Sequence, residues 1–197
     1  MKLQTSFLAL LGIVVSKSFS GAMPTDNEGE LQVLERRDAA APQACGDVTK
    51  LVPFFRLWNG AVKNDYYTTS IQEKQAALAA GYSDEGVAGW IWPNTTQPEL
   101  QTIPFYHVVN DQVHNDFYTI ATSERDNALN NLGYRNLGIA GYVYPDGACG
   151  GLPLFRLWSN AAQNDFYTMS AGERNNVIAS DSDRYILENT AAFLFRF

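Results

Sequence analysis

Hydrophobic and polar positions repeat in the same pattern three times between residues 51 and 197. Each copy has a proline-led apolar block, an Asn-Asp-aromatic-Tyr-Thr block, a Glu followed by Lys or Arg, and a final apolar block in which large side chains alternate. The first blocks begin at Pro53, Pro104 and Pro153, and the second at Asn64, Asn115 and Asn164. Blocks that recur in one order predict three similar units, in residues 51–100, 101–150 and 151–197.

A β-hairpin is predicted at the start of each unit. Proline at the first position of a strand loses no ladder hydrogen bond, and the Asn-Gly pair that follows in the first copy favours a turn. Alternation places Phe55 and Leu57 on the core face, and Arg56 and Trp58 on the opposite face. The equivalent core positions in the other copies are Tyr106, Val108, Phe155 and Leu157.

A short helix and a third strand are predicted to complete each unit. A capping box at residues 70–73 indicates a helix that ends near Ala79, and residues 170–173 repeat this box. The second copy has Ala121 at the capping position, so its helix is expected to start differently. The strand that follows, at 86–92 in the first copy, has aromatics at alternate positions.

These β-β-α-β units are each too small to bury an apolar face alone, so three should pack around a shared axis. We therefore expect a mainly β fold with one short helix per repeat, in a closed, pseudo-threefold, trefoil-like arrangement. Three small sheets arranged as in a propeller are the alternative. The domain spans residues 51–197, and residues 38–50 form an N-terminal arm.

The segment before this arm is typical of targeting and processing sequence. A basic start and an apolar run at 7–15 predict a secretory signal peptide over residues 1–20, because the run is too short to span a bilayer. An acidic propeptide at 21–37 follows and ends in Arg36 and Arg37. This pair resembles the cleavage site of Kexin-type proteases, and an ordinary solvated charge pair is the alternative. The mature protein is expected to be secreted and extracellular.

Two covalent features follow from that location. An oxidising compartment favours a disulfide between Cys45 and Cys149, with two buried free thiols as the alternative. Asn94 begins an Asn-Thr-Thr sequon in a linker rich in Pro and Thr, which predicts an exposed N-glycosylation site.

Composition argues against several classes of partner. The chain of 197 residues has 14 Lys+Arg against 21 Asp+Glu, which gives a formal net charge of -7. Nucleic acids and anionic membranes favour basic surfaces, so neither is expected as a partner. With 46% hydrophobic residues the chain can build a core, and a monomer is expected.

The residues opposite the core face suggest ligand binding. Arg56 with Trp58, and Arg156 with Trp158, each place a cation beside a large aromatic. An exposed indole beside fixed donors suits the C–H face and the hydroxyls of a sugar ring. The alternative is that each Trp packs on the helix of its own unit, with Arg stacked over it.

Three polar residues are assigned to the same candidate sites. Asn59 and Asp65 belong to the first, and Asp165 belongs to the second, because Asn and Asp can accept hydrogen bonds from sugar hydroxyls. The alternative is that Asn and Asp at a hairpin bend fix the turn. The second copy has His107 and Val109 in place of Arg and Trp, so its site should be the weakest or silent.

The tyrosines at one position of every copy, Tyr67, Tyr118 and Tyr167, are expected to be buried with satisfied hydroxyls. Catalysis has little support, since no G-x-S-x-G, Gly-rich phosphate loop or H-E-x-x-H occurs. The two histidines, His107 and His114, lack a metal-binding spacing, so no metal or cofactor is expected. Carboxylates that meet only in space leave a glycan hydrolase open.

The repeat also resembles an uncharacterised secreted repeat family of bacteria and fungi. Its units read roughly P-x-Y-R-L-Y, then D-H-F-Y-T-x-S, then E-G-[IV]-A-G-Y-V-Y. The matching blocks of the first unit are Pro53–Trp58, Asn64–Thr68 and Val87–Trp92. Members occur alone or appended to secreted hydrolases, which implies a binding role. This chain departs from the family at Asp65, Asp116 and Asp165, where the family has His.

The sequence thus predicts a secreted, non-enzymatic, lectin-like protein that binds cell-wall polysaccharide or glycans through repeated sites. A secreted inhibitor or effector that binds a protein is the first alternative, and a cell-wall glycan hydrolase is the second.

Overall fold

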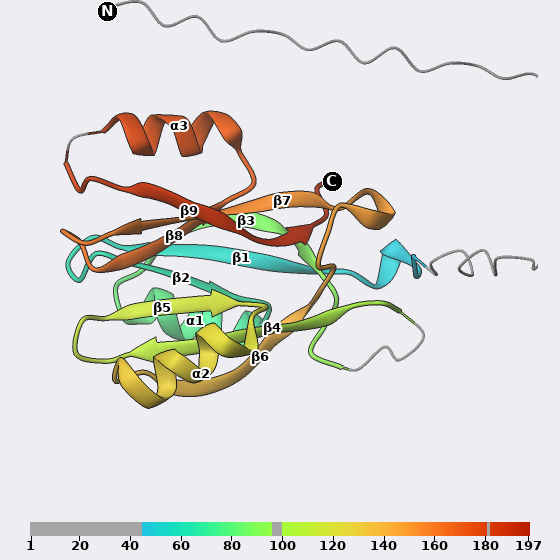
Figure 1. The fold of residues 1–197 in the computed structure, drawn as a ribbon, viewed down its shortest axis with the longest axis horizontal. Helices are drawn as coiled ribbons and strands as arrows, with labels where there is room; N and C mark the ends of the chain where they lie inside the picture. Colours follow the sequence, from blue (N-terminus) through green and yellow to red (C-terminus); the bar gives the residue numbers. More distant parts are fainter. Residues whose placement is uncertain (1–44, 96–99, 181) are drawn as a thin grey trace, which may run out of the picture. The chain divides into compact units, whose positions relative to one another are not determined.

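The computed structural model of the protein describes residues 45–95, 100–180 and 182–197, which all belong to one compact unit (Figure 1). In these ranges the fold is mainly β, with nine strands and three α-helices. None of the helices described there is long and apolar enough to cross a membrane.

Several sequence predictions lie outside the described residues. They are the signal peptide at 1–20, the propeptide at 21–37 with Arg36 and Arg37, and most of the arm at 38–50. These remain predictions.

Each repeat folds as a three-stranded antiparallel sheet with one helix, as its pattern predicts. The first unit comprises β1 (Val52–Asn59), β2 (Asn64–Thr68), α1 (Ile71–Ala79) and β3 (Ser83–Ile91). The second comprises β4 (Ile103–Asn110), β5 (Asn115–Thr119), α2 (Thr122–Asn131) and β6 (Arg135–Val143). The third comprises β7 (Leu152–Ser159), β8 (Asn164–Thr168), α3 (Ala171–Ala179) and β9 (Ile186–Leu194). The first strand of each unit is central, so the sheet orders are β2-β1-β3, β5-β4-β6 and β8-β7-β9.

The helices begin where the sequence predicts. Ser70 and Ser170 cap α1 and α3 by accepting a hydrogen bond from the backbone N–H of Glu73 and Glu173, at 3.2 and 3.1 Å. Ala121 precedes α2 and makes no side-chain cap. In all three units the Glu carboxylate also accepts a hydrogen bond from the threonine that ends the second strand. Each helix is therefore attached to the hairpin of its own unit.

Each sheet has β-bulges in its third strand, at the points where the register with the central strand shifts. The register shifts between Phe54 and Phe55, where β3 has one residue more than β1. Phe54 and Leu57 are both buried on this strand, while Phe55 is half-buried. The prediction that Phe55, Tyr106 and Phe155 face the core is wrong, because the alternation along the central strand is interrupted beside the bulge of its neighbour. The other three predicted core residues, Leu57, Val108 and Leu157, are fully buried. The misplaced rings each lie below a cation of their own helix, with Lys74 over Phe55, Arg125 over Tyr106 and Arg174 over Phe155.

Three tyrosines form a closed hydrogen-bonded cycle where β2, β5 and β8 meet. Each hydroxyl accepts a hydrogen bond from the backbone N–H of one neighbouring tyrosine and donates to the carbonyl of that same residue, at 2.6–3.0 Å. The three residues, Tyr67, Tyr118 and Tyr167, are at most 1% exposed. The prediction of buried tyrosines with satisfied hydroxyls is confirmed.

Isolated β-bridges join the three sheets in a second cycle, at the ends of β3, β6 and β9. The bridged pairs are Trp92 with Tyr142, Tyr144 with Phe193, and Phe195 with Trp90. Apart from these bridges, the described strands form three separate sheets and no closed barrel. The expectation of a closed β-barrel is thus wrong, because a single bridge between two neighbouring sheets does not extend their hydrogen-bonded ladders into one continuous sheet.

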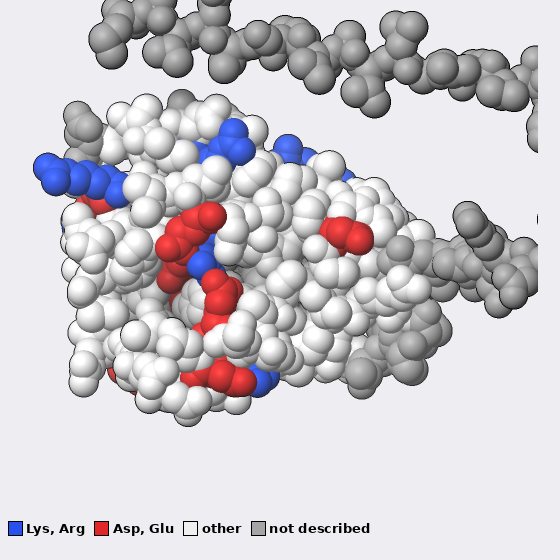
Figure 2. Space-filling model, in the orientation of Figure 1, with Lys and Arg blue, Asp and Glu red and all other residues white. Residues whose placement is uncertain are grey.

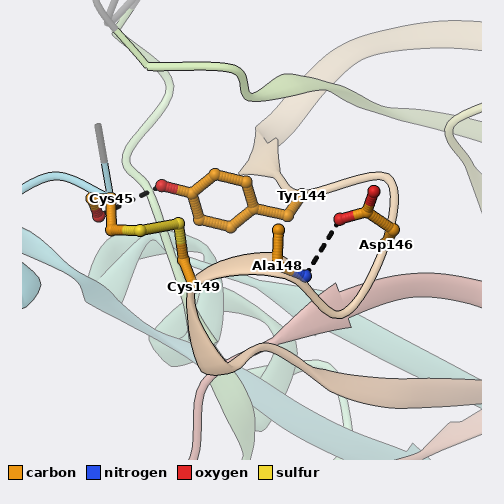
Figure 3. The surroundings of a disulfide bond; sticks show 5 residues. All are labelled: Cys45, Tyr144, Asp146, Ala148 and Cys149. Atoms are coloured by element: carbon orange, nitrogen blue, oxygen red, sulfur yellow. Dashed lines mark hydrogen bonds between the residues drawn. A yellow bond between two sulfur atoms is a disulfide. The ribbon is translucent and has the colours of Figure 1, made fainter. Parts of the chain in front are cut away.

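The predicted disulfide between Cys45 and Cys149 is confirmed (Figure 3). It links the start of the described chain to the loop that precedes β7, across 104 residues of sequence. The Tyr144 hydroxyl donates a hydrogen bond to the Cys45 carbonyl at 3.1 Å, so the N-terminal arm is held to the second unit beside the sulfur bridge (Figure 3).

Candidate functional site

The Asn-Asp pairs that begin β2, β5 and β8 connect neighbouring units. Each Asn amide donates to the carboxylate of another unit at 2.7–2.8 Å, and the backbone N–H of that Asp donates to the Asn oxygen. The connected pairs are Asn64 with Asp116, Asn115 with Asp165, and Asn164 with Asp65. All six residues are buried, so these side chains serve contacts between units. Asn59 instead fixes the β1–β2 turn, where its side-chain oxygen accepts the Ala61 N–H at 3.0 Å.

Burial also affects the protonation of two of these acids. It raises the pKa of Asp65 and Asp165 to about 7, although the amides of Asn164 and Asn115 and the nearby arginines oppose the rise. A carboxyl group in the unfolded chain has a pKa of about 3.9. Between these values the folded protein therefore binds more protons than the unfolded chain.

This difference predicts that stability falls as the pH rises from about 4 to 7, because ionisation is easier in the unfolded chain. A double substitution, Asp65→Asn with Asp165→Asn, keeps one oxygen acceptor in each side chain and removes the charge, so it should flatten the dependence over this range. Melting temperatures of both proteins, measured at intervals from pH 4 to 8, test the prediction. Parallel curves for the two proteins would contradict it.

A crevice between the second and third units brings three of the predicted site residues together. Arg156, Trp158 and Asp165 line a hollow of about 230 Å³, with Phe117 and Tyr134 of the second unit on the other side. Trp158 is half-buried, so part of its indole remains accessible. On the face where α2 lies, Figure 2 shows acidic side chains on both sides of a basic one beside a hollow in the surface.

The charged side chains of this crevice hold one another in place. The Arg156 guanidinium lies 3.1 Å from Glu124 and 2.6 Å from Glu188, and it stacks 4.9 Å from the ring centroid of Phe117. Burial opposes its charge, but the neighbouring acidic groups outweigh burial and raise the pKa of Arg156. Both glutamates are about one-third exposed, which leaves carboxylate oxygens at the surface of the crevice.

The corresponding contact of the first unit with the third, named the Trp58 crevice, has the same charged and aromatic groups. Arg56 lies 2.8 Å from Glu85 of its own unit and 3.0 Å from Glu173 of the third unit. Its guanidinium lies over the ring of Phe166, at 5.4 Å from the centroid. Trp58 is half-buried. It lies opposite Asp65 on the neighbouring strand, as Trp158 lies opposite Asp165.

The crevice between the first and second units differs at three positions. His107, Val109 and Leu137 occupy the places that Arg, Trp and Glu occupy in the other two crevices. His107 Nε2 lies 2.6 Å from Asp116, and its ring stacks on Tyr118. This crevice has no indole and no arginine on its central strand, although Arg135, which pairs with Asp111, lines its hollow. A weak or silent second site stays a prediction.

Comparison with known proteins gives one match. A family model described as a domain of unknown function, DUF5648, matches residues 53–195. The chain belongs to this family. No curated protein and no solved structure matches it. The DUF5648 domain begins at the second residue of β1 and ends just after β9, so it includes all three units.

Sequence reasoning missed the acidic partners of Arg56 and Arg156 in the DUF5648 domain. Glu85 and Glu188 occupy equivalent positions, where the second unit has Leu137. The signal was present in the repeats, because the two units with Arg and Trp in the first strand also have this Glu in the third. Glu124 and Glu173 lie in the first turn of α2 and α3, yet each also binds the arginine of a neighbouring unit.

The remaining predicted residues of the DUF5648 domain play other parts, and Asn94 lines a hollow with Glu73 and His107. Asn94 is exposed, as its sequon predicts, although Thr96 lies outside the described residues. His114 occupies the β4–β5 turn with a φ of 56°. Within the described ranges, no group of three or more His, Cys, Asp or Glu could hold a metal ion.

Proposed function

We propose that this DUF5648 protein is a secreted, monomeric, non-catalytic carbohydrate-binding protein. Sugar units of a cell-wall polysaccharide or glycan would bind in the Trp158 crevice and in the corresponding Trp58 crevice. The observation that carries the proposal is the hollow of about 230 Å³ in which Arg156, Trp158 and Asp165 converge. We also propose a pseudo-threefold, propeller-like relation between the units, which the two cycles of contacts support.

The composition of the crevice suits a neutral, hydroxyl-rich ring. The accessible part of the Trp158 indole provides a flat surface for C–H groups. Glu124 and Glu188 have accessible oxygens that can accept hydrogen bonds from hydroxyls, and their ion pairs with Arg156 fix them before a ligand arrives. A preorganised site loses less side-chain entropy on binding.

Asp65 and Asp165 would orient the arginine side chains and would not contact the sugar directly. Asp165 Oδ1 lies 3.8 Å from Arg156 Nε, and its other oxygen is bonded to Asn115. We therefore assign these aspartates to orienting the guanidinium, with direct sugar contact left to Trp, Arg and Glu.

The number of sites fits binding to a repetitive surface. The hollow is smaller than a typical ligand site of about 300–1,000 Å³, so it suits one ring of a longer chain. One such contact is weak, but two crevices on one molecule can gain by avidity on an insoluble polysaccharide.

Substitution of the tryptophans tests the assignment. Trp58→Ala and Trp158→Ala should each weaken retention on a polysaccharide matrix, and together abolish it. Both side chains are only half-buried, so melting temperatures should stay within a few degrees of the wild-type value. Val109→Ala, at the equivalent position of the second unit, is the matched control and should retain full binding. If the Trp variants unfold instead, the indoles are packing residues and the site assignment fails.

A further inference from the structure

The crevice between the first and second units has space where the other two crevices hold an arginine. In those two, the guanidinium binds a helix-start glutamate of the neighbouring unit, Glu173 for Arg56 and Glu124 for Arg156. The corresponding glutamate here is Glu73. Its would-be partner, His107, is shorter and is turned to Asp116.

One oxygen of Glu73 is left available by this difference. In all three units the Oε2 atom of the glutamate accepts the hydroxyl of a threonine, and in Glu173 and Glu124 the Oε1 atom faces an arginine. Glu73 Oε2 bonds the hydroxyls of Thr68 and Tyr66. Among the residues that the structure describes, Glu73 has no Lys or Arg within ion-pair distance.

An aromatic surface for a cation is present as well. Arg56 and Arg156 stack on Phe166 and Phe117, and the residue at that position in the first unit is Tyr66. Tyr66 and Glu73 both line a hollow of about 370 Å³, and Glu73 and His107 line a second hollow of about 260 Å³. The crevice therefore keeps the ring and the carboxylate that bind a guanidinium in the two related crevices, and it has room beside them.

We propose that this crevice binds a guanidinium group supplied from outside the chain, namely an arginine side chain of a peptide or protein partner. The group would stack on Tyr66 and pair with Glu73 Oε1, as Arg56 and Arg156 do with the corresponding residues of their crevices. A planar cation fits this combination of ring and carboxylate better than an ammonium does. The site is separate from the two carbohydrate crevices and does not depend on them.

Titration of the intact, disulfide-bonded protein with N-acetyl-arginine amide tests the proposal, followed through the NMR signals of Tyr66 and His107. Saturable shifts are expected for this probe. N-acetyl-citrulline amide has nearly the same shape without the charge, and it should bind at least about tenfold more weakly, because a hydrogen bond to a charged group is lost. Equal binding of the two probes would overturn the proposal, as would the absence of saturable shifts with arginine.

Two variants locate the site. Glu73→Gln keeps the hydrogen-bonding shape and should weaken arginine-amide binding about tenfold. His107→Arg should fill the crevice as Arg56 and Arg156 fill theirs, and so should prevent binding of the probe. Unchanged binding in both variants would place the probe elsewhere and contradict the proposal. If Glu73→Gln does not fold, the His107→Arg variant and the comparison of the arginine and citrulline probes still test the proposal.

Discussion

Tyr118→Phe is expected to lower the free energy of unfolding by about 2–6 kcal/mol, because it leaves two buried backbone groups without partners. The Tyr118 hydroxyl accepts the Tyr67 N–H at 3.0 Å and donates to the Tyr67 carbonyl at 2.6 Å. No water can replace it easily, since the residue is 0% exposed. The loss interrupts the tyrosine cycle between the first two units.

Urea denaturation of the purified protein measures this effect, and Tyr66→Phe is the matched control. The Tyr66 hydroxyl donates a hydrogen bond to the carboxylate of Glu73 near the surface, so its removal should cost about 0–1 kcal/mol. Equal destabilisation by the two substitutions would show that the cycle adds nothing beyond an ordinary surface hydrogen bond.

Removal of the disulfide has the second large expected effect. The Cys45–Cys149 bond closes a loop of 104 residues, and the chain-entropy estimate for such a loop is about 4–5 kcal/mol. The double variant Cys45→Ser/Cys149→Ser, which leaves no unpaired thiol, should lose a stability of this order. Thermal denaturation of the wild-type protein with and without a reducing agent provides an independent measure. A melting temperature that is the same in both conditions would contradict the prediction.

The local structure of each unit could be predicted from sequence because its signals are local. The Ser70 and Ser170 caps, the helix starts and the β-β-α-β order all follow from residues a few positions apart. The place of Phe55 could not be predicted in this way. The bulge beside it lies in β3, and nothing in the residues of the first block indicates where this bulge falls.

Contacts between units could not be predicted from the sequence, for a different reason. From sequence, the Asn and Asp residues at the hairpin bend can be sugar acceptors or turn residues, yet the amide of Asn64 binds Asp116, 52 positions later. Only the way in which β2, β5 and β8 meet brings these side chains together. The candidate site was therefore recognised from Arg156 and Trp158, whereas Glu124 of the neighbouring unit was not assigned to it.

The central claim is that the tryptophan crevices bind carbohydrate, and retention on insoluble polysaccharides tests it most directly. Disulfide-bonded protein would be passed over chitin, glucan, cellulose and peptidoglycan while the release of reducing ends is followed. We predict retention on at least one matrix without release, and loss of retention in the double variant Trp58→Ala/Trp158→Ala. Release of reducing ends would instead make the protein a hydrolase. Flow-through on every matrix would contradict carbohydrate binding and favour a protein partner.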